Sequence, residues 1–347
     1  MDSRFITKAK YQIKIDENYS QCLTCERRCK IERGKTGFCN TRINKDGEIF
    51  TLVYGLIPAI SFNPIEKKPL YHFHPGSIAL TVGTYGCNFS CFWCQNFHLS
   101  KTKAIKVSHL ASSDELLTPS RLIKIALQKG CQGTSISFNE PTLLFEYSVE
   151  VFKLAKKSGM YNTYITNGYM TEEVLRDLVD AGLDAMNIDI KGDSEMVHKY
   201  CGASVEKVWN IAKLARELGI HIEITTLLIQ DLNAKDDIIS KIAKRIFEEL
   251  GELTPFHISR FFPLYESEEH GLNDATPLEL LLNAYNLAKS IGLKYVYLGN
   301  LPVSDYENTY CPKCSRLVIK REGLRIAEKK LDFAGNCQFC GFPICIL

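Results

Sequence analysis

The sequence predicts an α/β fold built around a parallel sheet, with cysteine-rich extensions on both sides of it. Between residues 76 and 300, short β-like runs alternate with helical stretches, which is the pattern of repeated strand–helix units. Cysteines gather before and after this region, where the alternation is absent. Six or seven such units favour a barrel-type sheet, complete or partial, over an open doubly wound one, and the reactive groups of a barrel lie at the carboxyl ends of its strands.

The individual elements follow from two periodicities. Seven short runs rich in apolar and β-branched residues are the expected strands, over 77–83, 133–138, 162–166, 185–190, 221–229, 256–261 and 294–299. Amphipathic stretches between them are the expected helices, each closing at a glycine, over 119–130, 171–182, 205–219, 237–251 and 276–292. Thr171 is expected to cap the second helix, with Glu173 placed to support it.

Composition restricts the class of protein. The chain has 347 residues and a net charge of +2, so no overall charge favours a nucleic-acid or membrane partner. No run of eighteen apolar residues occurs, and the segment MDSRFITKAK lacks the apolar core of a secretion signal. We therefore expect a cytoplasmic protein. Thiols stay reduced in that compartment, so the fourteen cysteines are expected to bind metals or clusters rather than form disulfides.

Three regions are expected: an N-terminal cysteine-bearing extension over 1–75, the barrel over 76–300, and a zinc-ribbon-like tail over 301–347. The tail has two C-x2-C knuckles that suit a tetrahedral structural zinc ion, with rubredoxin-like iron as the alternative. The extension also offers four thiols, for which spacing does not separate structural zinc from an auxiliary cluster. The candidate ligands are Cys311, Cys314, Cys337 and Cys340 in the tail, and Cys22, Cys25, Cys29 and Cys39 in the extension.

A third group of cysteines lies in the loop after the first barrel strand. Cys87, Cys91 and Cys94 have the spacing C-x3-C-x2-C, which suits a cuboidal iron–sulfur cluster whose irons each accept one thiolate. The next cysteine, Cys131, is far along the chain, so one iron would be left open for a substrate or cofactor. A zinc loop or a set of buried thiols is the alternative, but zinc usually takes four ligands from paired knuckles.

With Trp93 included, this loop resembles the hallmark of the radical SAM superfamily, C-x3-C-x-aromatic-C after the first strand of a partial (β/α)6 TIM-type barrel. Cys87, Cys91, Trp93 and Cys94 match the pattern at every position. The resemblance implies that the three cysteines carry catalysis by holding a [4Fe-4S] cluster, whose open iron is chelated by S-adenosylmethionine (SAM). An electron from the cluster would then cleave SAM to methionine and a 5′-deoxyadenosyl radical.

Residues at later strand ends extend the resemblance. In FNEPT, Glu140 resembles the family's acidic residue for the SAM amino group, and a carboxylate there would pair with an ammonium in a partly desolvated site. His257 resembles a strand histidine that approaches SAM in activating enzymes, although a lone strand histidine is just as well explained as a packed core residue. The implied cofactor-binding set is Trp93, Asn139, Glu140, Thr166, Asn167, Asp189, Lys191 and His257.

Nearly the whole chain resembles the radical SAM enzymes of the AmmeMemoRadiSam system, which are related to pyruvate formate-lyase activating enzymes. The stretches CLTCERRCKIERGKTGFC, GTYGCNFSCFWCQN, FNEPT and YVYLGN and the tail knuckles carry this resemblance. It implies AMMECR1-like and Memo-like partner proteins and an electron donor such as flavodoxin or ferredoxin. The alternatives are an activase that abstracts hydrogen from a glycine of a protein partner, and a non-catalytic electron-transfer or zinc-scaffold protein.

Overall fold

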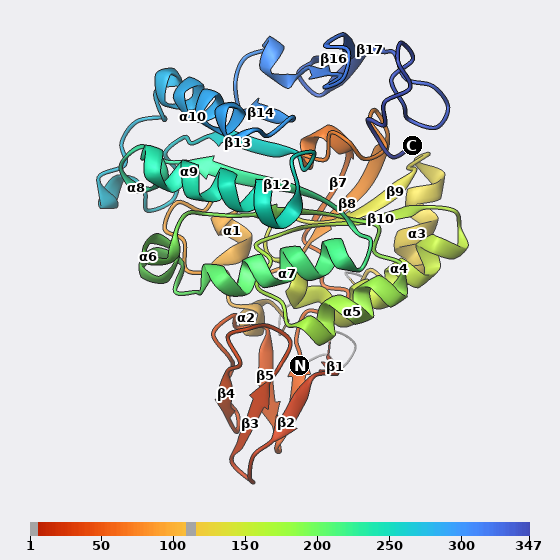
Figure 1. The fold of residues 1–347 in the computed structure, drawn as a ribbon. Helices are drawn as coiled ribbons and strands as arrows, with labels where there is room; N and C mark the ends of the chain where they lie inside the picture. The colour runs from red at the N-terminus through yellow and green to blue at the C-terminus, as the bar shows by residue number, and fades with distance from the viewer. Residues whose placement is uncertain (1–5, 109–115) are drawn as a thin grey trace.

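The computed structural model describes residues 6–108 and 116–347 and centres on one eight-stranded sheet. The strands follow the order β14-β13-β12-β11-β10-β9-β8-β7, and every pairing is parallel except that of β7 with β8. This order is a line and not a ring, so the barrel is partial, as predicted (Figure 1). The strands are β7 (Ala59–Pro64), β8 (Ile78–Gly83), β9 (Gly133–Ile136), β10 (Tyr161–Thr166), β11 (Ala185–Asp189), β12 (His221–Leu228), β13 (Phe256–Arg260) and β14 (Val296–Gly299).

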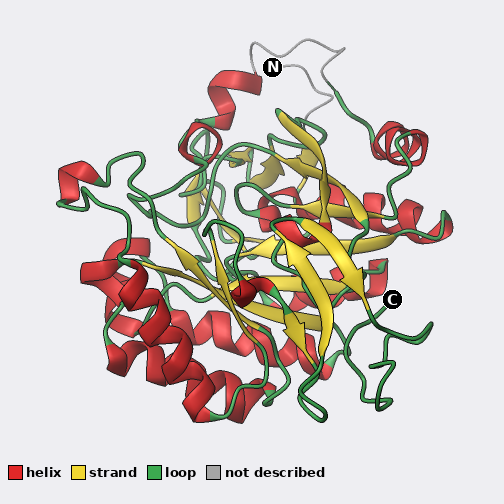
Figure 2. Ribbon diagram, turned by 90° about the horizontal axis from the view of Figure 1, so that it is seen from above, coloured by secondary structure: helices red, strands yellow, loops and turns green. Residues whose placement is uncertain are grey.

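Helices form a layer outside the sheet, in which successive helices pack against one another (Figures 1 and 2). All five expected helices are present, and α4 (Phe145–Lys157) is an additional one. The helix that starts at Asp236 changes to a π-helix over Ile246–Leu250 before it ends. In the described ranges, no helix has the length and apolar content that a bilayer crossing would need. The expected helices are α3 (Pro119–Gln128), α5 (Glu172–Ala181), α7 (Val205–Glu217), α9 (Asp236–Arg245) and α10 (Leu278–Ile291).

The start of α5 differs from the prediction in its hydrogen bonding. Thr171 occupies the N-cap position, but its side chain makes no capping hydrogen bond. The Thr171 hydroxyl instead donates to the carbonyl oxygen of Leu23 at 2.9 Å. The predicted N-cap position of Thr171 is therefore confirmed, but its side chain does not form the capping hydrogen bond, because the hydroxyl is engaged by the N-terminal extension. The support from Glu173 stays a prediction.

The two extensions form small antiparallel sheets at opposite ends of the molecule (Figure 1). Strand β7 belongs by sequence to the N-terminal range, yet it pairs with β8 along its whole length, and the division into three regions stays a prediction. The remaining strands are β1 (Thr7–Lys8), β5 (Arg42–Lys45) and β6 (Glu48–Thr51) in one N-terminal sheet, β2 (Gln12–Lys14), β3 (Tyr19–Cys22) and β4 (Lys30–Glu32) in the other, and β15 (Thr309–Tyr310), β16 (Leu317–Glu322) and β17 (Arg325–Lys329) in the tail.

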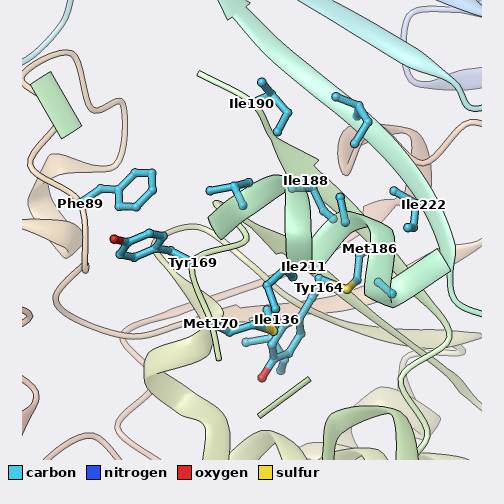
Figure 3. Packing of buried hydrophobic residues seen from close by; sticks show 14 of the residues in the cluster. Phe89, Ile136, Tyr164, Tyr169, Met170, Met186, Ile188, Ile190, Ile211 and Ile222 are labelled. Atoms are coloured by element: carbon cyan, nitrogen blue, oxygen red, sulfur yellow. The ribbon is translucent and has the colours of Figure 1, made fainter. Parts of the chain in front are cut away.

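The core between the sheet and the helices also fixes the cysteine loop. Met186 and Ile188 of β11 are fully buried, and Ile211 of α7 belongs to the same cluster (Figure 3). Phe89, two residues after the first cysteine of the loop, contacts Tyr169 after β10, with ring centroids 5.3 Å apart. Burial of such aromatic pairs stabilises their relative position, so core packing sets where the three thiols lie.

Candidate active site at the strand ends

A cavity of about 560 Å³ opens where the parallel strands end. Its wall takes residues from the loops after β8 and β9, from the ends of β10 to β13, and from Asn300 after β14. The carboxyl ends of parallel strands meet at one face of a barrel, so residues far apart in sequence come together there. Ten predicted site residues line the cavity: Cys87, Cys91, Trp93, Cys94, Asn139, Glu140, Thr166, Asn167, Asp189 and Lys191.

The thiols of the cysteine loop are held by local hydrogen bonds. The Phe89 backbone N–H donates to Cys87 Sγ at 3.4 Å, and the Cys94 Sγ atom lies 3.1 Å from the Ser100 hydroxyl. Burial raises the pKa of the Cys87 thiol above its ordinary value. An N–H or O–H donor stabilises a thiolate in such a buried place, so these contacts prepare the sulfurs to act as ligands.

Asn139 holds the start of this loop. Its side-chain nitrogen donates to the Gly86 carbonyl oxygen at 2.8 Å, and its side-chain oxygen accepts from the Thr84 N–H at 3.1 Å. The residue before it, Phe138, has a positive φ of 70°, a conformation that costs energy for a residue with a side chain. The predicted cofactor residue Asn139 thus lines the cavity and also positions the loop that carries the cysteines.

Glu140 is a buried carboxylate that joins the ends of β9 and β10. One carboxylate oxygen accepts from the Thr142 N–H at 3.0 Å and from the Thr166 hydroxyl at 2.8 Å, and the other accepts from the Asn167 N–H at 2.8 Å. Burial raises the pKa of Glu140, and these donors oppose that effect. The Asn167 side chain in turn donates to the Asn88 amide oxygen at 2.8 Å, so the Glu140 network is tied to the cysteine loop.

Asp189 and Lys191 place an ion pair beside the cysteine loop. Lys191 Nζ lies 3.1 Å from Asp189 Oδ2. Burial opposes the charge on Lys191, but the Asp189 carboxylate, together with the sulfurs of Cys91 and Cys201, raises the pKa of Lys191 above its ordinary value. The Cys91 and Cys201 sulfurs lie 3.5 Å apart, and this contact lowers the pKa of Cys91; Lys191 acts in the same direction. Cys201 was not predicted, because it stands alone in the sequence and has no metal-ligand spacing.

His257 does not reach the cavity lining. Its Nε2 atom lies 2.6 Å from Glu223, a fully buried carboxylate that also contacts His221 at 2.9 Å. The N–H groups of Tyr71 and His72 donate to the same carboxylate. The structure therefore places His257 in a buried network deeper in the barrel, which matches the core-residue alternative, and its predicted contact with SAM stays untested.

The cavity also has a basic wall that the sequence did not indicate. Lys67 and Lys68, from the segment between β7 and β8, line it together with Ser259 and Asn300. Lys68 is buried, and its Nζ atom lies 5.1 Å from the centre of the Phe138 ring. Burial, and to a smaller extent the charge of the neighbouring Lys67, lowers the pKa of Lys68 to about 8. No motif marks these lysines, and only the fold brings them to the strand ends.

The tail cysteines converge on one point. The Cys311 and Cys340 sulfurs are 3.5 Å apart, and the Cys314 and Cys337 sulfurs are 3.8 Å apart. All four sulfurs lie within 4.8 Å of one another, and this is the one such group in the described part of the chain. The arrangement fits a single tetrahedral ion with four thiolate ligands.

The strand-end cavity fits a different kind of occupant. Its three cysteines all face the cavity, yet they do not lie within 4.8 Å of one another in the described structure. A cuboidal cluster needs sulfur atoms that are further apart than around a single ion, since each thiolate binds a different iron. Lys191 supplies a positive charge next to Cys91, and the Glu140 carboxylate supplies a negative one suited to an ammonium group. The residues present therefore fit a [4Fe-4S] cluster with SAM beside it.

Comparisons with known proteins agree with this geometry. The family model of the radical SAM superfamily matches residues 81–242. An uncharacterized protein of Methanocaldococcus jannaschii is 38% identical over 343 residues, which cover 98% of this chain and 99% of that protein. A second protein of the same organism, provisionally named a glycyl-radical enzyme activating enzyme, is 33% identical over 222 residues, or 62% of this chain and 78% of that protein.

Among solved structures, a domain of a pyruvate-formate lyase-activating enzyme from Bacteroides vulgatus matches 48% of this chain and 99% of its own, with 19% identity and a TM-score of 0.41. The chain belongs to the radical SAM superfamily. Members of this superfamily are enzymes, and membership implies a [4Fe-4S] cluster and SAM as cofactors.

Proposed function

We propose that this enzyme binds its [4Fe-4S] cluster through Cys87, Cys91 and Cys94 and uses it to form a 5′-deoxyadenosyl radical. The observation that supports this most is that ten predicted residues, from four successive strand ends, line one cavity. When bound, the cluster and SAM supply a one-electron cleavage of the SAM sulfonium. The chain's own residues hold the sulfurs, place the charges and enclose the site.

Each side chain has a distinct part in this proposal. Cys87 is fixed by the N–H of Phe89, and Lys191 offsets negative charge near Cys91. Glu140 offers a carboxylate whose orientation is set by donors from the ends of two strands. We assign it to the amino group of SAM, because a fixed, buried carboxylate pairs strongly with an ammonium. Asn139 acts by positioning the loop.

The proposed reaction is abstraction of a hydrogen atom from a macromolecular or small-molecule substrate, in the context of the AmmeMemoRadiSam system. AMMECR1-like and Memo-like proteins are the proposed partners, and a flavodoxin or ferredoxin is the proposed electron donor. A zinc ion is proposed for the tail, since its four sulfurs already have the spacing of a single-ion site.

The test is anaerobic reconstitution followed by dithionite and SAM, with 5′-deoxyadenosine measured by chromatography. The wild-type enzyme should produce 5′-deoxyadenosine, and replacing Cys87, Cys91 or Cys94 by Ala should abolish it. Cys131→Ala is the matched control, because Cys131 is buried and lies outside every cysteine group. Protein with an intact cluster that yields no 5′-deoxyadenosine would refute the proposal.

An activase acting on a glycine of a partner protein is the second candidate. The relative provisionally named a glycyl-radical enzyme activating enzyme, 33% identical, supports it. This candidate predicts that deuterium placed on the α-carbon of a partner's glycine appears in 5′-deoxyadenosine. Transfer of deuterium from a free small molecule would exclude it while leaving radical formation intact.

A further inference from the structure

The four cysteines of the N-terminal extension surround a small enclosed space of their own. Cys22 is the last residue of β3, the backbone of Cys25 forms an isolated antiparallel β-bridge with Met170, and Cys29 directly precedes β4. These three and Cys39 all line one cavity, which is separate from the large cavity at the strand ends. Residues from 22 to 39 are thus folded so that their thiols face a common centre.

Two buried residues in the wall of the same space have donors without acceptors. Arg42 is 1% exposed; its two terminal nitrogens contact Glu146 at 2.6 Å and the Leu143 carbonyl at 3.3 Å, but its Nε atom has no partner. Asn88 is fully buried, and its Nδ2 atom has no partner either. Both residues line the cavity of the four thiols. A buried donor left without an acceptor destabilises the folded protein, and an anionic occupant would satisfy two groups that the chain itself does not.

The distances between the sulfurs distinguish a single zinc ion from a larger occupant. A zinc ion binds thiolates at about 2.3 Å, which places the sulfurs of a tetrahedral site about 3.8 Å apart. The tail cysteines have this spacing, whereas no three of the N-terminal sulfurs lie within 4.8 Å of one another in the described structure. The space between the N-terminal thiols also admits the centre of a water molecule over about 10 Å³. A zinc ion with four thiolates at about 2.3 Å leaves no such space.

We propose that Cys22, Cys25, Cys29 and Cys39 bind a second [4Fe-4S] cluster. Four cysteine thiolates are the usual ligand set of such a cluster, and each binds a different iron, so the sulfurs stand further apart than around one ion. The cluster core is anionic with its thiolates, and it accepts hydrogen bonds at sulfur. Arg42 Nε and Asn88 Nδ2 are the donors for it.

The second site shares a wall with the cysteine loop of the first. A Cβ atom on Gly86 would lie 2.4 Å from the Cys39 carbonyl oxygen, so Gly86 and Cys39 are in direct backbone contact. Asn88 directly follows Cys87, yet it lines the N-terminal cavity, and its carbonyl oxygen accepts from Arg27 Nε at 2.5 Å. Because the backbones of Gly86 and Cys39 are in contact, the cysteine loop can supply Cys87 to the strand-end cavity and Asn88 to the wall of the N-terminal one.

The test uses the full-length chain, reconstituted anaerobically, with iron, acid-labile sulfide and zinc all measured. The triple variant Cys87→Ala, Cys91→Ala, Cys94→Ala should keep about four iron and four sulfide per chain, with an EPR signal after reduction. Sulfide identifies the cluster, because a rubredoxin-like iron in the tail carries none. A triple variant with no sulfide, or with two zinc ions per chain, would overturn the proposal.

Two further measurements guard against a variant that does not fold. Wild-type protein should bind about eight iron and eight sulfide per chain, and a saturating value of about four each would contradict the second cluster. In the triple-variant background, Asn88→Asp keeps the acceptor oxygen but removes the Nδ2 donor and adds a negative charge. It should lower the reduction potential of the remaining cluster without changing its sulfide content, and an unchanged potential would contradict the contact. This proposal does not depend on SAM cleavage, so either can fail alone.

Discussion

Lys68 in the wall of the large cavity carries a charge that burial disfavours. The side chain is 5% exposed, and burial together with Lys67 lowers its pKa from 10.5 to about 8, with no acidic partner among the described residues to offset this. One pKa unit corresponds to about 1.4 kcal/mol. Holding Lys68 charged therefore costs the folded protein about 3 kcal/mol below pH 8. Lys68→Met keeps the unbranched stem and removes the charge, so the variant should be more stable by up to this amount.

The sign of the pH dependence follows from the direction of the shift. Because the folded-state pKa lies below the unfolded one, the unfolded chain holds the additional proton between about pH 8 and pH 10.5. Wild-type stability should therefore rise with pH across this window relative to Lys68→Met. The advantage of the variant should be complete below pH 8 and lost above pH 10.5.

Anaerobic urea denaturation of both proteins, below pH 8 and at about pH 10, measures this difference. Lys124→Met is the matched control, because Lys124 is exposed on α3 and should give the same midpoint as wild type at both pH values. A Lys68→Met variant that is less stable than wild type near neutral pH would refute the reasoning. So would a difference that does not change with pH. A buried lysine that is kept at this cost without an acidic partner among the described residues is typical of a functional site.

Three other predictions test separate parts of the molecule. Gly86→Ala should destabilise the protein by about 2 kcal/mol more than Gly130→Ala. A Cβ atom at Gly86 would lie 2.4 Å from the Cys39 carbonyl oxygen, whereas Gly130, which also has a positive φ, has open space around it. Urea midpoints and iron content measure this difference, and equal midpoints for the two variants would contradict it. Glu140→Gln should keep the cluster but weaken SAM binding by about tenfold to a hundredfold, measured as the SAM concentration for half-maximal 5′-deoxyadenosine formation; an unchanged value would remove Glu140 from the SAM site. Cys311→Ala should abolish zinc binding and reduce the yield of folded protein, with SAM cleavage per cluster unchanged; loss of cleavage in well-folded protein would show that the tail is not merely structural.

Much of the fold was predictable because its signals are local. The seven parallel strands are short β-rich runs bounded by turn residues, and the five expected helices end at glycines such as Gly182 and Gly292, which adopt positive φ. Helix α4 was missed although its buried residues Phe145, Ser148, Phe152 and Ala155 recur at helical spacing. Its start in PTLLFEY reads as a continuation of the loop, and a 3-10 turn does precede it there.

The candidate site was predictable only where its residues belong to a recognisable motif or spacing. The cysteine loop has a spacing that few other functions produce, and Glu140 follows a strand within a motif. Lys68 and Cys201 belong to no such motif, because only tertiary packing brings Lys68 to the cavity and the Cys201 thiol to Cys91. The same limit applies to His257, whose partner Glu223 lies on the neighbouring strand and engages it in a buried network.

The central claim is that the three thiols at the strand ends hold a cluster that cleaves SAM. The most direct measurement is 5′-deoxyadenosine formed per chain by anaerobically reconstituted protein with dithionite and SAM, alongside Cys91→Ala and Cys131→Ala. The claim predicts product from the wild type and from Cys131→Ala, and none from Cys91→Ala. Wild-type protein with a full complement of iron and sulfide but no 5′-deoxyadenosine, or a Cys91→Ala variant that still forms it, would contradict the claim.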